Sequence, residues 1–238
     1  WISVPGIFWL TAVMGLVGIA VLVLWVPAAP PVTLSDEPHS WRELARVLSN
    51  PELLRLDGGI FILHAILTSL FVAVPLALRD AGLDGPHHWQ VYLPVMLLSI
   101  GLLLPLLRLS ERGDWYKPVF LLCILMLAMS QAGLALAHHG RWVMAVLLLL
   151  FFTGFNLLEA MLPSLISRQA PAGHRGAAMG VYSSLQFLGT FCGGVLGGLV
   201  LGQLGLGGVF ALSAGLALAW LGFAAFMRSH GVGRELRL

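Results

Sequence analysis

One carboxylate, Glu159, lies inside a long apolar stretch between Arg141 and Arg168. At the rise of an α-helix, the nine residues from Glu159 to Arg168 correspond to about 13 Å. A carboxylate at that depth in a membrane is costly, and it usually serves a function such as binding a proton or a cationic group. We expect Glu159 to line a central cavity; the alternative is a structural carboxylate that ties two helices together.

Two further polar residues could line the same cavity. Asn156 precedes Glu159 by three residues and therefore falls on the same helical face. His64 lies in another apolar stretch and shares a face with Asp57 and Thr68. Imidazole titrates near neutral pH and is inexpensive to bury when neutral, so His64 fits either a cavity or a hydrogen bond between helices.

Three glutamines add weaker candidates. Gln186 lies near the middle of the apolar stretch that follows Arg175, where it could contact a substrate. Gln90 and Gln131 fit hydrogen bonds between helices equally well, each worth about 0.6 kcal/mol. The candidate cavity residues are therefore Glu159, Asn156, His64 and Gln186.

Glycines recur at four-residue spacing in the stretch that carries Gln186. Such small-xxx-small patterns let two helices approach closely. The spacing predicts close packing on two sides of one helix, with the positions Gly189, Gly193, Gly194, Gly197 and Gly198.

Composition indicates that lipid surrounds these stretches. Of 238 residues, 58% are hydrophobic and only 10% are charged, and the mean hydropathy is +0.91. A soluble domain is about one quarter charged. Windows of about 20 apolar residues predict seven membrane-spanning helices in an all-helical fold. They lie at 6–26, 57–79, 84–108, 117–141 and 141–168, with two more between 175 and 228 separated by a turn at 202–208.

The distribution of basic residues predicts the orientation. With Trp1 outside, eleven of the thirteen Lys and Arg residues fall on the inner side, and only Arg79 and Arg141 lie outside. Because inner loops carry the excess of positive charge, the C-terminus is expected to be cytoplasmic. The expected location is the inner (plasma) membrane of a bacterium.

The polar segment between the first two spans differs from the other loops. Ser40 and Glu43 have the spacing of a capping box. Trp41, Leu44, Val47 and Leu48 then fall on one face, which predicts a short amphipathic helix on the inner membrane surface. Asn50 and Pro51 fit the N-cap and first position of the next helix.

Several function classes lack their motifs. No G-x-S-x-G, H-E-x-x-H, phosphate-binding loop or zinc spacing occurs, so we expect no enzyme, cofactor or metal site, and no nucleic-acid partner. A retinal protein needs a lysine within a helix, whereas Lys117 lies at a loop edge. A non-transporting membrane receptor or scaffold remains the alternative class.

The order of these features resembles the C-terminal portion of the major facilitator superfamily. The segment 109–117 looks like a loose form of the family's loop between helices eight and nine. The segment 171–180, leading into paired glycines, looks like its entry to helix eleven. The segments 41–54 and 153–163, the latter with Thr153 and Pro163, are similar to proton-linked efflux members.

This resemblance implies a domain plan and a mechanism. Residues 1–27 would be helix six, 28–52 the cytoplasmic connector, 53–229 the six-helix C-terminal half and 230–238 a cytoplasmic tail. The protein's partners would be a small-molecule substrate, protons, the lipid bilayer and an N-terminal half outside this sequence. The implied activity is alternating-access transport, as proton-coupled efflux. The implied cytoplasmic gate comprises Glu111, Arg112, Asp57 and Arg175.

Overall fold

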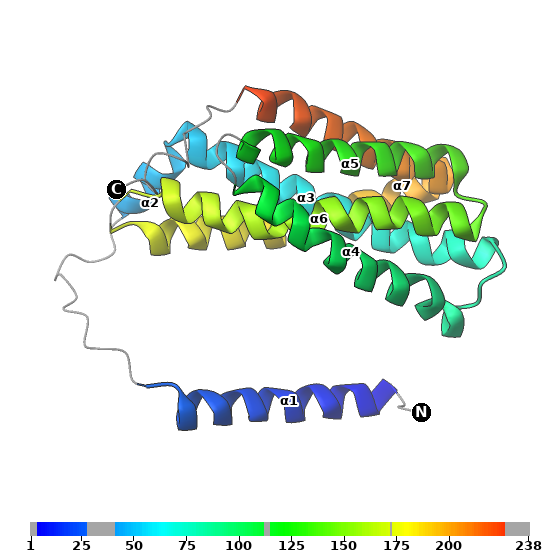
Figure 1. Ribbon diagram of the computed structural model, residues 1–238, viewed down its shortest axis with the longest axis horizontal. Coiled ribbons are helices and arrows are strands. Elements are labelled where there is room, and N and C mark those ends of the chain that lie inside the picture. Colours follow the sequence, from blue (N-terminus) through cyan, green and yellow to red (C-terminus); the bar gives the residue numbers. More distant parts are fainter. Residues whose placement is uncertain (1–3, 28–40, 112–114, 172, 227–238) are drawn as a thin grey trace. The chain divides into compact units, whose positions relative to one another are not determined.

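The structure is a computed structural model that describes residues 4–27, 41–111, 115–171 and 173–226 (Figure 1). Its regular elements are all helices, which confirms the all-helical prediction. The chain divides into two compact units, Trp1–Ser40 and Trp41–Leu238, each described by itself below.

The described part of the first unit is the long helix α1 (Val4–Trp25) and the two residues after it. Its segment Pro5–Trp25 has a mean hydropathy of 2.6 and no buried residues. A helix that is apolar on every side is stable in lipid rather than in water. The first predicted span is therefore confirmed as a helix within two residues of its expected ends.

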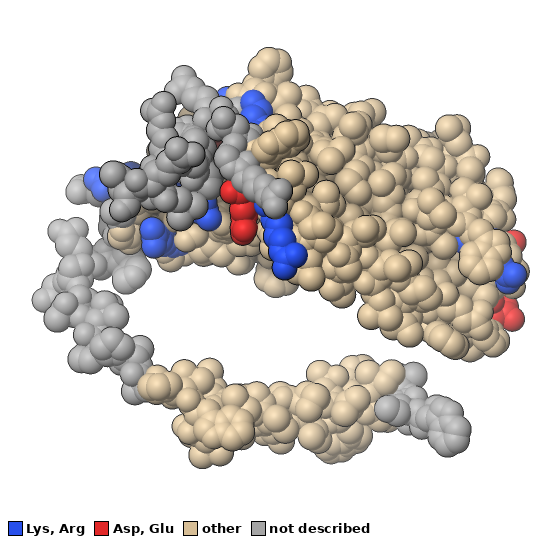
Figure 2. Space-filling model, in the orientation of Figure 1, with Lys and Arg blue, Asp and Glu red and all other residues tan. Residues whose placement is uncertain are grey.

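The second unit is a helical bundle. Figure 2 shows its Lys, Arg, Asp and Glu side chains near the two ends, with a broad uncharged band between them. Such a band fits the hydrocarbon core of a bilayer. The elements are α2 (Trp41–Leu48), α3 (Pro51–Asp80), the 3-10 turn η1 (Gly85–His87), α4 (Trp89–Ser110), α5 (Tyr116–Ala137), α6 (Arg141–Gln169) and α7 (Arg175–Ala225).

Helix α7 accounts for the last two predicted spans. It has 51 residues, which is far more than one crossing needs. The break lies at Gly205, with φ 68° and ψ −168°, inside the expected turn. Six described helices are long and apolar enough to cross a membrane, and this break divides one of them into two segments.

The conformation of Gly205 gives a first testable prediction. Residues with a side chain almost never adopt this backbone region, so Gly205→Ala should destabilise the protein by about 1–3 kcal/mol. Gly215→Ala is the matched control, because Gly215 is helical and a Cβ there meets no atom within 4 Å. Thermal unfolding in detergent should show a lower midpoint for Gly205→Ala alone; equal midpoints would contradict the break at Gly205.

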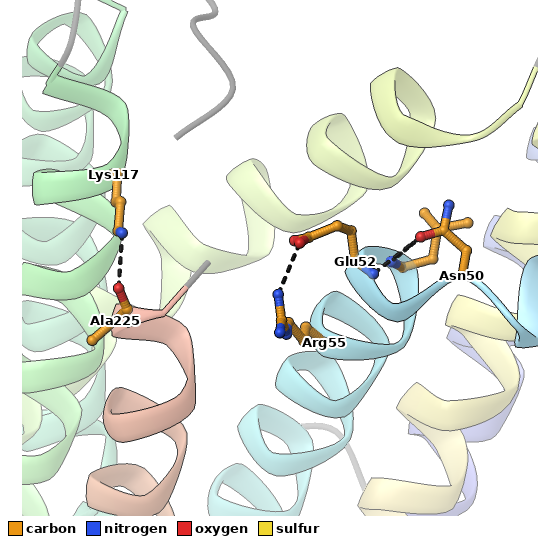
Figure 3. Close-up of polar contacts among 6 residues, drawn as sticks. Asn50, Glu52, Arg55, Lys117 and Ala225 are labelled. Atoms are coloured by element: carbon orange, nitrogen blue, oxygen red, sulfur yellow. Dashed lines mark hydrogen bonds and ion pairs between the residues drawn. The ribbon is translucent and has the colours of Figure 1, made fainter. Parts of the chain in front are cut away.

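The entry to α3 follows the expected capping chemistry. The Asn50 side chain accepts hydrogen bonds from the backbone N–H groups of Glu52 (3.0 Å) and Leu53 (3.4 Å). Glu52 also pairs with Arg55 at 2.8 Å (Figure 3). Helix α3 therefore begins at Pro51, six residues before the charge-free window that predicted it.

The amphipathic helix α2 forms as predicted, although its apolar face divides. Val47 is buried and Leu44 packs against the core, whereas Trp41 and Leu48 are exposed. Ser40 and the side chain of Glu43 lie outside the described residues, and the predicted capping box with them.

Helix α3 is central to the bundle because both segments of α7 pack on it. A Cβ on Gly59 would meet the Trp220 ring at 3.0 Å. Trp220 is fully buried and contacts Phe120 of α5 edge-on, with 6.1 Å between ring centroids. Lys117 Nζ donates to the carbonyl of Ala225 at 2.8 Å, which joins the start of α5 to the end of α7 (Figure 3).

Candidate functional site

The site is built on the contact between α3 and the first segment of α7, which we call the α3–α7 seam. It pairs Gly189 with Phe61, Gly193 with Ala65 and Gly197 with Ser69. A Cβ added to Gly189 or Gly193 would collide with the backbone carbonyl of its partner. The residue numbers rise together on both helices, so the helices run in parallel and their backbones touch.

A hydrogen bond fixes the seam. Ser69 is buried, and its hydroxyl donates to the carbonyl of Gly193 at 2.9 Å. The sequence analysis missed Ser69. Ala65, Ser69 and Ala73 repeat at four-residue spacing, so a search for small residues on the partner helix could have found it.

The second glycine row is placed differently. A Cβ on Gly194 would reach Thr68 at 3.5 Å, an ordinary contact, and one on Gly198 would meet nothing within 4 Å. Of the five predicted glycines, Gly189, Gly193 and Gly197 therefore make the close contacts with α3.

Three of the four candidate cavity residues meet beside this seam. His64 of α3 places its Nε2 atom 2.9 Å from the Gln186 amide nitrogen of α7. The same Nε2 lies 3.5 Å from Oε1 of Glu159 on α6. Three helices thus converge on one imidazole, and we call His64, Gln186 and Glu159 the polar triad.

The hydrogen bonds favour one tautomer of His64. Its Nδ1 lies 3.3 Å from the Ile60 carbonyl, which can only accept, so Nδ1 carries a hydrogen. In the neutral ring Nε2 is then the acceptor, and the Gln186 amide donates to it. Protonation of Nε2 would turn it into a donor and would favour Glu159 as its partner over the Gln186 amide nitrogen. The triad can therefore hold a proton in two different arrangements.

Glu159 is poised for such a change. Its Oε1 atom is buried and makes no hydrogen bond within the described part of the chain. Its side chain as a whole remains 31% exposed, whereas that of His64 is 10% exposed. The Oε1 atom therefore lies against the imidazole, while another part of the side chain is open to a small molecule or water.

Aromatic rings extend the site from His64. The Phe155 ring lies 5.9 Å from the His64 ring and 5.8 Å from Phe151, on which it stacks. Phe152 connects this group to Phe71, whose side chain is exposed. Sequence reasoning missed these rings, because phenylalanines in a membrane helix carry no distinguishing pattern.

Asn156 is the candidate that the structure places elsewhere. Its amide donates to the Ser99 hydroxyl of α4 at 3.1 Å, and Ser99 donates to Met96 at 2.8 Å. Asn156 thus links α6 to α4 and contacts no member of the polar triad through a hydrogen bond.

No ion pair joins the implied gate residues that the structure describes. Glu111 and Arg175 are exposed and make no ion pair with any described residue, while Arg112 lies outside the described residues. Asp57 is 1% exposed and lies on the buried side of α3. Among the described residues, no three His, Cys, Asp or Glu side chains are arranged to hold a metal ion.

Comparison with known proteins gives consistent relatives. The sequence matches the Major Facilitator Superfamily over residues 1–190 and again over 95–236. It is 40% identical over 238 residues to the inner membrane transport protein YajR of Escherichia coli, covering all of this chain and 52% of the relative. It is 30% identical over 189 residues to an uncharacterized transporter of Buchnera aphidicola, covering 79% of this chain and 48% of that protein.

A more distant relative carries a descriptive name. The methyl viologen resistance protein SmvA of Salmonella typhimurium is 25% identical over 168 residues, which are 71% of this chain and 34% of SmvA. The chain spans about half the length of the curated relatives YajR and the Buchnera transporter.

Proposed function

Because the chain belongs to the major facilitator superfamily, whose members are transporters rather than enzymes, we propose that it forms part of a proton-coupled exporter of small molecules. The protein would lie in the inner membrane of a bacterium and would work by alternating access around a site near the middle of the bilayer. The observation that carries this proposal is the polar triad of His64, Gln186 and Glu159.

The triad supports proton coupling because Gln186 and Glu159 compete for the same atom, Nε2 of His64. Gln186 fits the neutral imidazole, at 2.9 Å, and Glu159 fits the protonated one, at 3.5 Å. The residues come from α7, α6 and α3, so a change of partner would alter the contacts between three helices. A ligand or proton can shift a conformational equilibrium only through such a difference between states.

Exposure of Glu159 supports a direct exchange of proton for substrate. A carboxylate in an apolar site needs a counter-charge, and either a proton or a cation provides one. We propose that Glu159 binds these two alternately, so that a proton arriving from outside displaces the substrate. With one proton exchanged per molecule, a pH difference of about one unit would sustain about tenfold accumulation.

The neighbouring rings favour an organic cation as the substrate. The Phe155 ring lies against the His64 ring of the triad, and Phe152 connects Phe155 to Phe71. Aromatic faces attract cations by about 0.5–2 kcal/mol each. The name of the SmvA relative refers to resistance against methyl viologen, which is a flat aromatic dication. Ethidium, a fluorescent aromatic cation, is therefore a suitable first probe.

The test uses everted membrane vesicles that contain the protein expressed from its own gene. An imposed pH gradient should drive ethidium accumulation, and a protonophore should abolish it. Vesicles with no overproduced protein provide the background. Accumulation that survives collapse of the proton gradient would contradict proton coupling, and absence of accumulation would contradict organic-cation export.

A further inference from the structure

A second buried carboxylate lies on the α3–α7 seam, at the end that the count of basic residues predicts to be cytoplasmic. Asp57 is 1% exposed, and its Oδ1 atom is buried without a hydrogen-bond partner among the described residues. Burial without a partner destabilises the charged form of a carboxyl group, so it favours the protonated form.

Tyr182 provides a second unpartnered group on the opposite helix. The residue is 4% exposed, and its hydroxyl is buried and bonds to no described group. This hydroxyl lies within electrostatic range of both Glu159 and Asp57. Tyr182 is thus the described tyrosine that lies near both the polar triad and the second carboxylate.

The packing of the seam explains why Asp57 lies near Tyr182. Asp57, Phe61 and Ala65 follow one another at four-residue intervals on the face of α3 that contacts α7. Since Phe61 meets Gly189 and Ala65 meets Gly193, the same interval puts Asp57 level with residue 185 of α7, between Tyr182 and Gln186. A line of polar groups thus runs along the seam from His64 to Asp57.

No cation neutralises Asp57 within the described structure. On α3, Arg55 pairs with Glu52. On α7, no charged side chain follows Arg175, which is itself exposed. Helix α2 packs on both α3 and α7, and its Arg46 is exposed as well. The register of the seam therefore places no basic side chain of α7 opposite Asp57, and the Tyr182 phenol lies within its electrostatic range.

We propose that Asp57 and Tyr182 form a proton relay that connects the polar triad to the cytoplasm. A proton leaves the Glu159 carboxyl group and is accepted by the Tyr182 oxygen, directly or through water. Tyr182 passes its own hydrogen to the Asp57 carboxylate, and Asp57 then releases a proton to water at the cytoplasmic end. The relay rests on the proposed function, because only a proton-coupled cycle needs such an exit.

The relay predicts a loss of transport rate without a loss of substrate binding. In vesicles, Asp57→Asn should lower the initial rate of gradient-driven ethidium accumulation by about a hundredfold or more, the lower end of the range for lost proton-transfer groups. Its equilibrium affinity for ethidium should stay unchanged. Tyr182→Phe, which keeps the ring, should also slow accumulation. Asp80→Asn, at the exposed far end of α3, is the matched control and should transport normally.

Each outcome decides between the proposals. If the native protein is driven by the gradient and both Asp57→Asn and Tyr182→Phe transport at its rate, the relay is wrong and the proposed function stands. If Asp57→Asn does not fold, Tyr182→Phe decides by the same criterion. A rate that falls together with the affinity would indicate a structural role and overturn the relay. A native protein without gradient dependence would overturn the relay and the proposed function together.

Discussion

Gly193→Ala should strongly destabilise the second unit. The added methyl group would collide with the carbonyl of Ala65, and backbone atoms on a long packed helix cannot move aside as a side-chain end can. Separating α3 from α7 would also stretch the 2.9 Å bond from Ser69 to the Gly193 carbonyl. Overpacking of this kind costs about 3 kcal/mol, a large part of a typical stability.

Gly194→Ala is the control, since it makes the same change one residue along the same helix. Its Cβ would lie at an ordinary 3.5 Å from Thr68, and alanine favours a helix over glycine by about 1 kcal/mol. Thermal unfolding in detergent should therefore separate the neighbours, with a lower midpoint for Gly193→Ala only. Similar midpoints for the two variants would show that the helices are not in backbone contact at Gly193.

Glu159→Gln should abolish gradient-driven transport. Glutamine has nearly the shape of a protonated glutamate, so the fold should persist while the group can neither release a proton nor attract a cation. Accumulation of ethidium in everted vesicles should fall to background, a loss of about tenfold at a pH difference of about one unit. The measurement is the fluorescence of accumulated ethidium before and after the gradient is imposed.

The matched control for this variant is Glu52→Gln, which removes the same charge. Glu52 lies at the start of α3, where Arg55 is its ion-pair partner among the described residues, and a pair of that kind is worth at most about 1 kcal/mol. Glu52→Gln should transport like the native protein. Transport by Glu159→Gln at the native level would assign Glu159 a structural role.

Much of the fold follows from the sequence because lipid restricts the choices. With no water to satisfy backbone groups, each apolar window must form a helix, and charges mark where each window ends. The break at Gly205 lies inside the glycine-rich turn that was expected. Helix α3 begins at Pro51, as the Asn50–Pro51 pair predicts, although the charge-free window starts only after Asp57, a carboxylate that the bundle buries.

The candidate site was only partly predictable. Glu159, His64 and Gln186 are polar residues in apolar stretches, so their type alone identifies them. Their pairing depends on how three helices pack, which no local pattern encodes. For the same reason Asn156, equal to the others by sequence, instead bonds to Ser99 of α4. The aromatic rings and Ser69 acquire a role only through their neighbours in space.

Proton release on substrate binding tests most directly whether Glu159 exchanges a proton for the substrate. Ethidium would be added to the purified native protein in weakly buffered detergent, with the pH and the bound dye followed together. We predict that about one proton is released per ethidium bound, as expected for two cations competing for one carboxylate, and that Glu159→Gln releases none. Ethidium binding without proton release by the native protein, or undiminished release by Glu159→Gln, would contradict this mechanism.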